Sequence, residues 1–139
     1  MASEALYIYV LSLGIFLIAL GVVEIFAPLK VFEIWTKWVS RKEFFMHGLI
    51  LIVGGFPLTI YNGALSGLIF FMGLIPVLIG PFILFYPEKV KNVFLEMSSG
   101  MSSDSEKTSI KKIILFDAGI RISIGAVFTI SFAMSKGLI

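Results

Sequence analysis

Four long apolar stretches alternate with two short amphipathic segments along this chain. The apolar stretches cover about 5–27, 44–61, 64–86 and, from 109 or 113, up to 134. Each is close to the roughly 20 residues that a helix needs to cross a bilayer. The pattern predicts an all-α integral membrane protein, with four transmembrane helices in a single domain over 1–139.

The two amphipathic segments, 28–43 and 87–97, each begin with a proline that directly follows an apolar stretch. Proline breaks the preceding helix and suits the first position of the next one. On a helix, apolar and polar side chains of these segments fall on opposite faces, which is typical of helices that lie at a membrane interface. We therefore expect each segment to be an interfacial elbow between two spans. The expected interfacial anchors are Trp35, Trp38, Lys30, Lys37, Arg41, Lys89 and Lys91.

The two halves of the chain repeat each other. The string Gly-x6-Pro-x-Lys-Val begins at Gly21 and again at Gly80, and after a 12-residue insertion Gly48 and Gly54 correspond to Gly119 and Gly125. Each half, 5–62 and 64–134, is predicted to be a helix–elbow–helix hairpin, and the two hairpins are related by a pseudo-twofold axis along the membrane normal. Small residues let helix backbones approach closely. The glycines expected to pack these helices are Gly14, Gly21, Gly48, Gly54, Gly73, Gly80, Gly119 and Gly125.

The Gly-x6-Pro elbow, followed by a helix with Gly-x5-Gly, resembles the YjeT-like inner-membrane proteins, which are small two-span chains of unassigned function. The resemblance implies a tandem fusion of two such units over nearly the whole chain. The family has a carboxylate one residue before the elbow glycine, where this chain has Leu20 and Ile79. No catalytic residue is implied, because the family offers none.

Basic residues gather on one side of the predicted bundle. Nine lie in the elbows and in the polar, Ser-rich segment 98–112, which is expected to be a loop, whereas the opposite side has only Lys136. This bias predicts cytoplasmic elbows and outward-facing termini in a cell or inner membrane. The basic residues would contact anionic lipid or an acidic partner. Nucleic acid is not expected, because the charges are few and interleaved with glutamates.

Four ionisable residues lie within the apolar stretches, where such residues are costly and point by default to a functional site. Glu24, His47 and Asp117 are expected at one depth near the cytoplasmic side, with Arg121 one turn deeper. Three interpretations remain open. The residues could pair among themselves, with Asp117 on Arg121 at i,i+4 and Glu24 on His47 across the first hairpin. They could instead form a proton or ion path, or they could contact a partner protein.

Composition narrows the function. Hydrophobic residues make up 58% and charged residues 14%, mean hydropathy is +1.02, and there is one His and no Cys. These values leave no room for a soluble catalytic domain, a thiolate metal site or bis-His haem ligation. We expect no enzyme activity, cofactor or metal. The predicted function is a non-catalytic accessory or scaffold subunit that packs against other membrane subunits or a copy of itself. The alternative is a small oligomeric transporter or channel that uses Glu24, His47 and Asp117.

Overall fold

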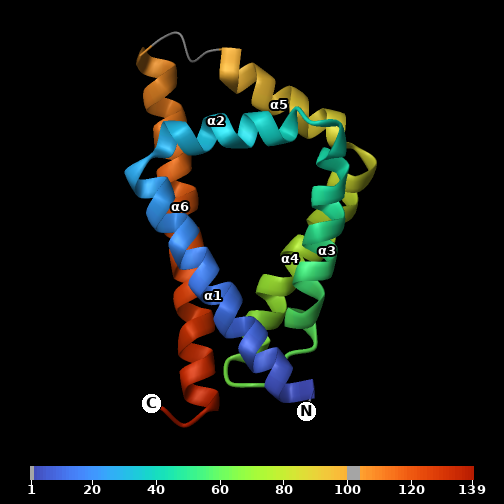
Figure 1. Ribbon diagram of the computed structural model, residues 1–139, viewed down its shortest axis with the longest axis vertical. Coiled ribbons are helices and arrows are strands. Elements are labelled where there is room, and N and C mark those ends of the chain that lie inside the picture. Colours follow the sequence, from blue (N-terminus) through green and yellow to red (C-terminus); the bar gives the residue numbers. More distant parts are fainter. Residues whose placement is uncertain (1, 100–103) are drawn as a thin grey trace.

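The computed structural model describes residues 2–99 and 104–139, and these residues are almost entirely helical (Figure 1). The helices are α1 (Ala2–Phe26), α2 (Pro28–Val39), α3 (Phe45–Thr59), α4 (Ser66–Phe85), α5 (Pro87–Ser99) and α6 (Asp104–Ser135). A 3-10 turn, η1 (Lys42–Phe44), leads into α3. The described residues contain no strand, so the all-α prediction is confirmed. The elbow helices α2 and α5 begin at the two prolines, as expected.

Three of the described helices are long and apolar enough to cross a membrane, not the four predicted. They cover Glu4–Phe26, Ser66–Phe85 and Lys107–Ser135. The exception is α3, whose 15 residues reach about 22 Å at 1.5 Å per residue, less than the roughly 30 Å of a hydrocarbon core. It is short because η1 precedes it and because the chain leaves the helix after Thr59, ahead of the left-handed Leu65 (φ 60°).

The polar segment 98–112 is largely not the loop that its composition predicts. Helix α5 extends to Ser99 and α6 begins at Asp104; residues 100–103 lie outside the described part of the chain. The first turns of α6 bury Ile110 and Ile114 against Phe32 of α2. Tertiary packing of this apolar face stabilises helix in a segment whose composition alone favours a loop.

The four long helices form two pairs, each made between the halves of the chain (Figure 1). Helix α1 packs along α6, and α3 packs along α4. The pairs converge where both termini lie, and they diverge toward the other end, which α2 and α5 cross. The expected close hairpins within each half are therefore wrong. The 12 residues of α2 form a rod of about 18 Å that holds the ends of α1 and α3 apart.

Glycines bring the backbones together within both pairs. A Cβ on Gly80 would lie 2.5 Å from the carbonyl oxygen of Gly48, and a Cβ on Gly125 would lie 2.5 Å from that of Gly14. Such distances leave no room for a side chain, so only glycine permits this approach. The predicted packing glycines that make close contacts across a pair are Gly14, Gly21, Gly48, Gly73, Gly80 and Gly125.

Two of the predicted packing glycines do not make close interhelical contacts. A Cβ on Gly119 would have no described atom within 4 Å, and one on Gly54 would meet only the Tyr9 hydroxyl, at 3.5 Å. In α3 and α6 the correspondence between the two halves is shifted by one residue from the expected one. Gly55, rather than Gly54, faces its partner helix as Gly125 does. By the same register Ala118, rather than Gly119, is the counterpart of Gly48.

The end where the termini lie is tied together by a core and a small polar network. Val10, Leu58, Ile69 and Phe128 are buried there with Tyr61. The Tyr61 hydroxyl shares hydrogen bonds with the hydroxyls of Ser131 (2.7 Å) and Ser135 (3.2 Å) on α6. The backbone N–H of Ala64 donates to the Ser135 hydroxyl (2.9 Å). These contacts fix the loop between α3 and α4 against the other helix pair.

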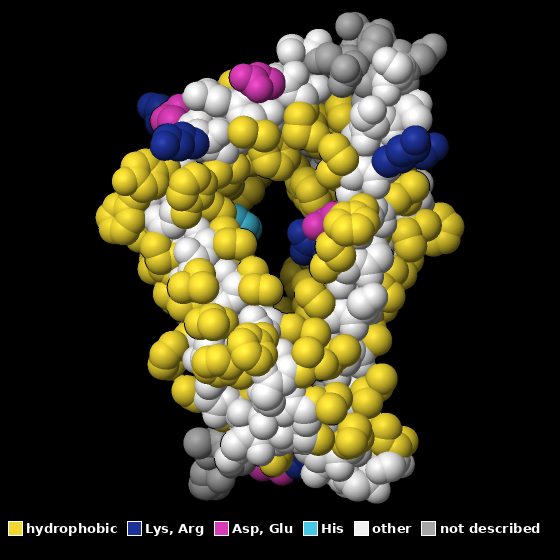
Figure 2. All heavy atoms as spheres, turned by 180° about the vertical axis from the view of Figure 1, so that it is seen from behind, with side chains coloured by type: hydrophobic (Ala, Val, Ile, Leu, Met, Phe, Trp, Pro, Cys, Tyr) yellow, Lys and Arg dark blue, Asp and Glu magenta, His cyan; other side chains and the backbone are white. Residues whose placement is uncertain are grey.

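The face of the bundle drawn in Figure 2 exposes many apolar side chains, which are coloured yellow. Phe26 is 83% exposed and Phe85, at the equivalent position of the second half, is 72% exposed. Monomeric soluble proteins rarely expose contiguous apolar patches of more than a few hundred Å². The surface and the three long helices are together compatible with a membrane protein.

Candidate functional site: a cavity between the helix pairs

The divergence of the two helix pairs creates a cavity of about 900 Å³. Figure 2 shows the opening between the pairs, which passes through the bundle from one face to the other and has charged side chains at the edge of a largely hydrophobic rim. All six helices line it, with α2 and α5 closing the end away from the termini. The lining is mostly aliphatic and aromatic. This size and composition are typical of small-molecule sites, which measure about 300–1,000 Å³.

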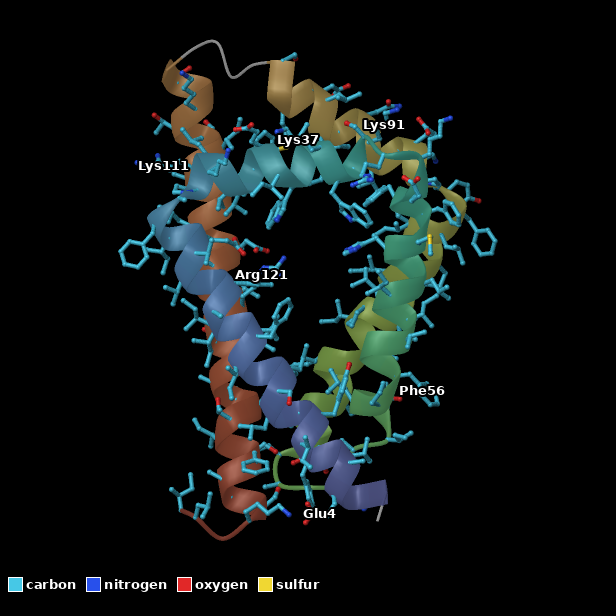
Figure 3. The ribbon with its side chains drawn as sticks, viewed as in Figure 1. Glu4, Lys37, Phe56, Lys91, Lys111 and Arg121 are labelled. Atoms are coloured by element: carbon cyan, nitrogen blue, oxygen red, sulfur yellow. The ribbon has the colours of Figure 1, made fainter. Side chains whose placement is uncertain are left out.

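A three-residue ionic cluster stands on the α1/α6 wall of the cavity. Arg121 points from α6 toward the space between the pairs (Figure 3). Its Nε lies 2.5 Å from Oδ2 of Asp117, one turn earlier on the same helix, and 2.8 Å from Oε1 of Glu24 on α1. The guanidinium carbon also lies 5.5 Å from the centre of the Trp35 ring on α2. The cluster thus joins three helices around one guanidinium.

Glu24 is the buried member of this cluster. Its side chain is 3% exposed, against 33% for Asp117 and 30% for Arg121. One carboxylate oxygen is bound to Arg121, but the other, Oε2, is buried and has no hydrogen-bond partner among the described residues. A buried polar atom without a partner typically costs 1–3 kcal/mol, and more when the group is charged. This oxygen therefore has unused capacity to accept a hydrogen bond.

His47 lines the same cavity from the α3 wall. Its ring stacks on Phe44 with the centroids 5.9 Å apart, and it meets Trp38 edge-on at 6.2 Å. The expected Glu24–His47 hydrogen bond is not formed, because α1 packs on α6 and Glu24 pairs with Arg121 instead. His47 and Asp117 are placed alike by the glycine contacts, because each stands one residue before the small residue, Gly48 or Ala118, whose carbonyl oxygen meets a glycine of the paired helix.

The apolar face of α2 covers the cavity. Trp35 and Trp38, expected as anchors in the membrane interface, are half-buried and line the cavity. Lys30 and Lys37 are exposed on the opposite face of α2, where each forms an ion pair with Glu33. The remaining predicted anchors lie at the same end of the bundle, with Arg41 and Lys89 exposed and Lys91 half-buried. Figure 3 shows Lys37 and Lys91 on the two elbow helices.

Sequence reasoning missed the contact that closes the cavity toward the termini. The hydroxyl of Tyr9 on α1 donates a hydrogen bond to the backbone carbonyl of Gly54 on α3, which joins the two pairs. A tyrosine in an apolar stretch needs a partner for its hydroxyl. The hydroxyl of Tyr9 within an apolar stretch was such a signal. Its hydrogen-bond partner is a backbone carbonyl, however, which a pattern of side chains does not reveal.

Within the described residues, no group of three or more His, Cys, Asp or Glu side chains could hold a metal ion. Comparison with protein-family models, curated proteins and solved structures finds no match to this chain. The resemblance to YjeT-like proteins stays a prediction that rests on the elbow motif. Functional inference therefore depends on the cavity itself.

Proposed function

We propose that this protein is a small membrane transporter that binds an amphipathic molecule in the cavity between its helix pairs. The observation that carries the proposal is the unpartnered Oε2 of Glu24, a residue that lines a cavity of about 900 Å³. A ligand with a hydrogen-bond donor and an apolar body would satisfy this oxygen and cover the apolar lining at once. The proposal adopts the transporter alternative, with Glu24 and Asp117 in the binding site.

The size of the cavity favours a small molecule over a helix of a partner subunit. A helix is about 10 Å across and rises 1.5 Å per residue, so 900 Å³ would hold roughly eight residues, or about two turns. A spanning helix needs about 20 residues. Its path would also be blocked at the end where α1 and α3 are joined by the Tyr9–Gly54 hydrogen bond. The accessory-subunit interpretation would need another surface.

The architecture offers a simple route for access and movement. The opening in Figure 2 lies on the side of the bundle, which would face lipid if the long helices crossed the bilayer. A ligand would then enter from the membrane rather than from water. The two pairs are each fastened by glycine contacts, so they can move as rigid bodies about the end where they converge. Rocking of one repeat-related bundle against another is a common mechanism in transporters.

Binding can be tested by tryptophan fluorescence, because Trp35 and Trp38 are the only tryptophans in the chain and both line the cavity. The probe is 11-bromoundecanol, which has a hydroxyl donor, an apolar body and a bromine that quenches tryptophan. We expect saturable quenching with about one binding site per chain. Replacing Gly54→Leu places a side chain in the cavity and should weaken binding at least about fivefold.

Gly119→Leu is the matched control for Gly54→Leu, because a side chain at Gly119 meets no described atom and lies outside this cavity. It should leave the quenching curve unchanged. Quenching that rises without saturation would show only partitioning of the alcohol into detergent or lipid. That result, or identical curves for the two leucine variants, would overturn the proposed function.

The proposed orientation places α2 and α5 on the cytoplasmic side and both termini outside, with the long helices across the cell or inner membrane. The support is the gathering of Lys and Arg at the elbow end, while Lys136 is paired with Glu4 at the other.

The orientation can be tested by thiol labelling. The chain has no cysteine, so a thiol reagent can label only the single cysteine that is introduced. In intact cells, a membrane-impermeant maleimide should label Leu138→Cys but not Lys37→Cys. Lys37→Cys should react only after permeabilisation, and the reverse pattern would invert the orientation.

A further inference from the structure

We infer that the ligand of this cavity is a lipophilic organic cation, with its positive group at Glu24 and its apolar body against the α3/α4 wall. This inference rests on the proposed function and specifies its substrate class. It follows from the charges that face the cavity, from the contacts that already engage Arg121, and from the difference between the two walls.

The cavity wall carries an excess of negative charge. Among the described lining residues, the charged ones are Glu24, Asp117 and Arg121, so the formal charge is −1 when both carboxylates are ionised and His47 is neutral. The excess matters because the surroundings are apolar, and Coulomb interactions are several-fold stronger there than in water. A cation bound beside Glu24 would neutralise this wall, whereas an anion would add to the imbalance.

Arg121 is already paired with two carboxylates, which weakens its attraction for an anionic ligand. Both carboxylates lie within 2.8 Å of its Nε, and the Trp35 ring lies 5.5 Å from the guanidinium carbon. An anion that bound the remaining N–H groups of the guanidinium would lie beside two carboxylates and would be repelled by them. The free acceptor is Oε2 of Glu24, a residue that is 2% exposed. This oxygen would interact most favourably with a positive or hydrogen-bond-donating group.

The opposite wall has the properties of a site for an apolar body. In the repeat register of the structure, the counterpart of Glu24 is Ile83 and that of Arg121 is Leu51, and both line the cavity. The charged half of the site is therefore not duplicated. Trp38 adds an aromatic ring, which is favourable for an organic cation. A metal ion fits poorly, since the described residues offer no cluster of three ligands.

The test compares tetraphenylphosphonium with tetraphenylborate, which have nearly the same shape and opposite charge. Binding is measured by equilibrium dialysis with the full chain in nanodiscs of zwitterionic phosphatidylcholine, and empty nanodiscs are subtracted. We expect the phosphonium to bind at least about tenfold more tightly than the borate. Glu24→Gln should remove most of that preference while keeping an oxygen for Arg121. The control is Glu33→Gln, an exposed carboxylate outside the cavity, which should keep the full preference.

The outcomes separate this inference from the proposed function. Equal or tighter binding of the borate, or full preference in a correctly folded Glu24→Gln chain, would overturn the cation inference. If neither ion binds although 11-bromoundecanol quenches saturably, the cation inference is wrong and the proposed function stands. If the alcohol also fails to quench, the proposed function itself is wrong.

Discussion

Gly80→Leu is expected to lower the free energy of unfolding by about 3 kcal/mol or more, the upper part of the range for overpacked sites. The Cβ of the new side chain would lie 2.5 Å from the Gly48 carbonyl oxygen and equally close to Cγ1 of Ile52. A backbone oxygen cannot move aside as a flexible side chain can, so α3 and α4 must separate. Unfolding in mixed detergent micelles, followed by circular dichroism, measures the loss.

The control for Gly80→Leu is Gly67→Leu, near the start of the same helix. A Cβ there meets no described atom within 4 Å, and leucine favours helix over glycine. Its stability should stay within about 1 kcal/mol of the natural chain or rise slightly. The α1/α6 pair allows an independent repetition of this comparison, in which Gly125→Leu should destabilise and Gly119→Leu should not. Equal stability of Gly80→Leu and Gly67→Leu would contradict the close packing of α3 on α4.

The pairing of the helices was the part of the fold that sequence could not supply. Apolar length and the two elbow prolines were sufficient to place α1, α2, α4 and α5. Glycines at seven-residue spacing marked faces for close packing, but similar faces occur in both halves. Such faces can pair within a half or between halves. The choice depends on the stiffness and length of α2, which separates α1 from α3, and this is a property of the assembled molecule.

Of the contacts in the ionic cluster, only the one within a single helix could be predicted from the sequence. Asp117 and Arg121 are four residues apart on one helix, and that spacing was enough to expect their contact. Glu24 joins them because α1 packs on α6, so the hydrogen bond to His47 that was one of the alternatives does not form. Glu24, His47 and Asp117 all line one cavity. The covering of this cavity by α2 depends on tertiary packing, which no local sequence pattern reveals.

Arg121→Met is expected to cost about 3 kcal/mol of unfolding free energy, the lower part of the range for breaking a buried ion pair. Methionine retains much of the apolar stem of arginine but leaves two carboxylates facing an apolar cavity without a counterion. Of the two, Glu24 has the greater effect, because its side chain is only 3% exposed. An exposed pair supplies the control. Lys37→Met removes an ion pair at 3.3 Å whose side chains are more than half exposed, and it should cost no more than about 1 kcal/mol.

Restoring charge balance should recover most of this loss. In the triple variant Arg121→Met, Glu24→Gln and Asp117→Asn, both amides retain the shape of the carboxylates but carry no charge. Buried ion pairs can often be replaced as a unit with little cost, whereas removing one partner is severe. If the triple variant is instead as unstable as Arg121→Met, the loss comes from the packing of Arg121 on Trp35. Recovery would show that Arg121 serves chiefly to neutralise the two carboxylates.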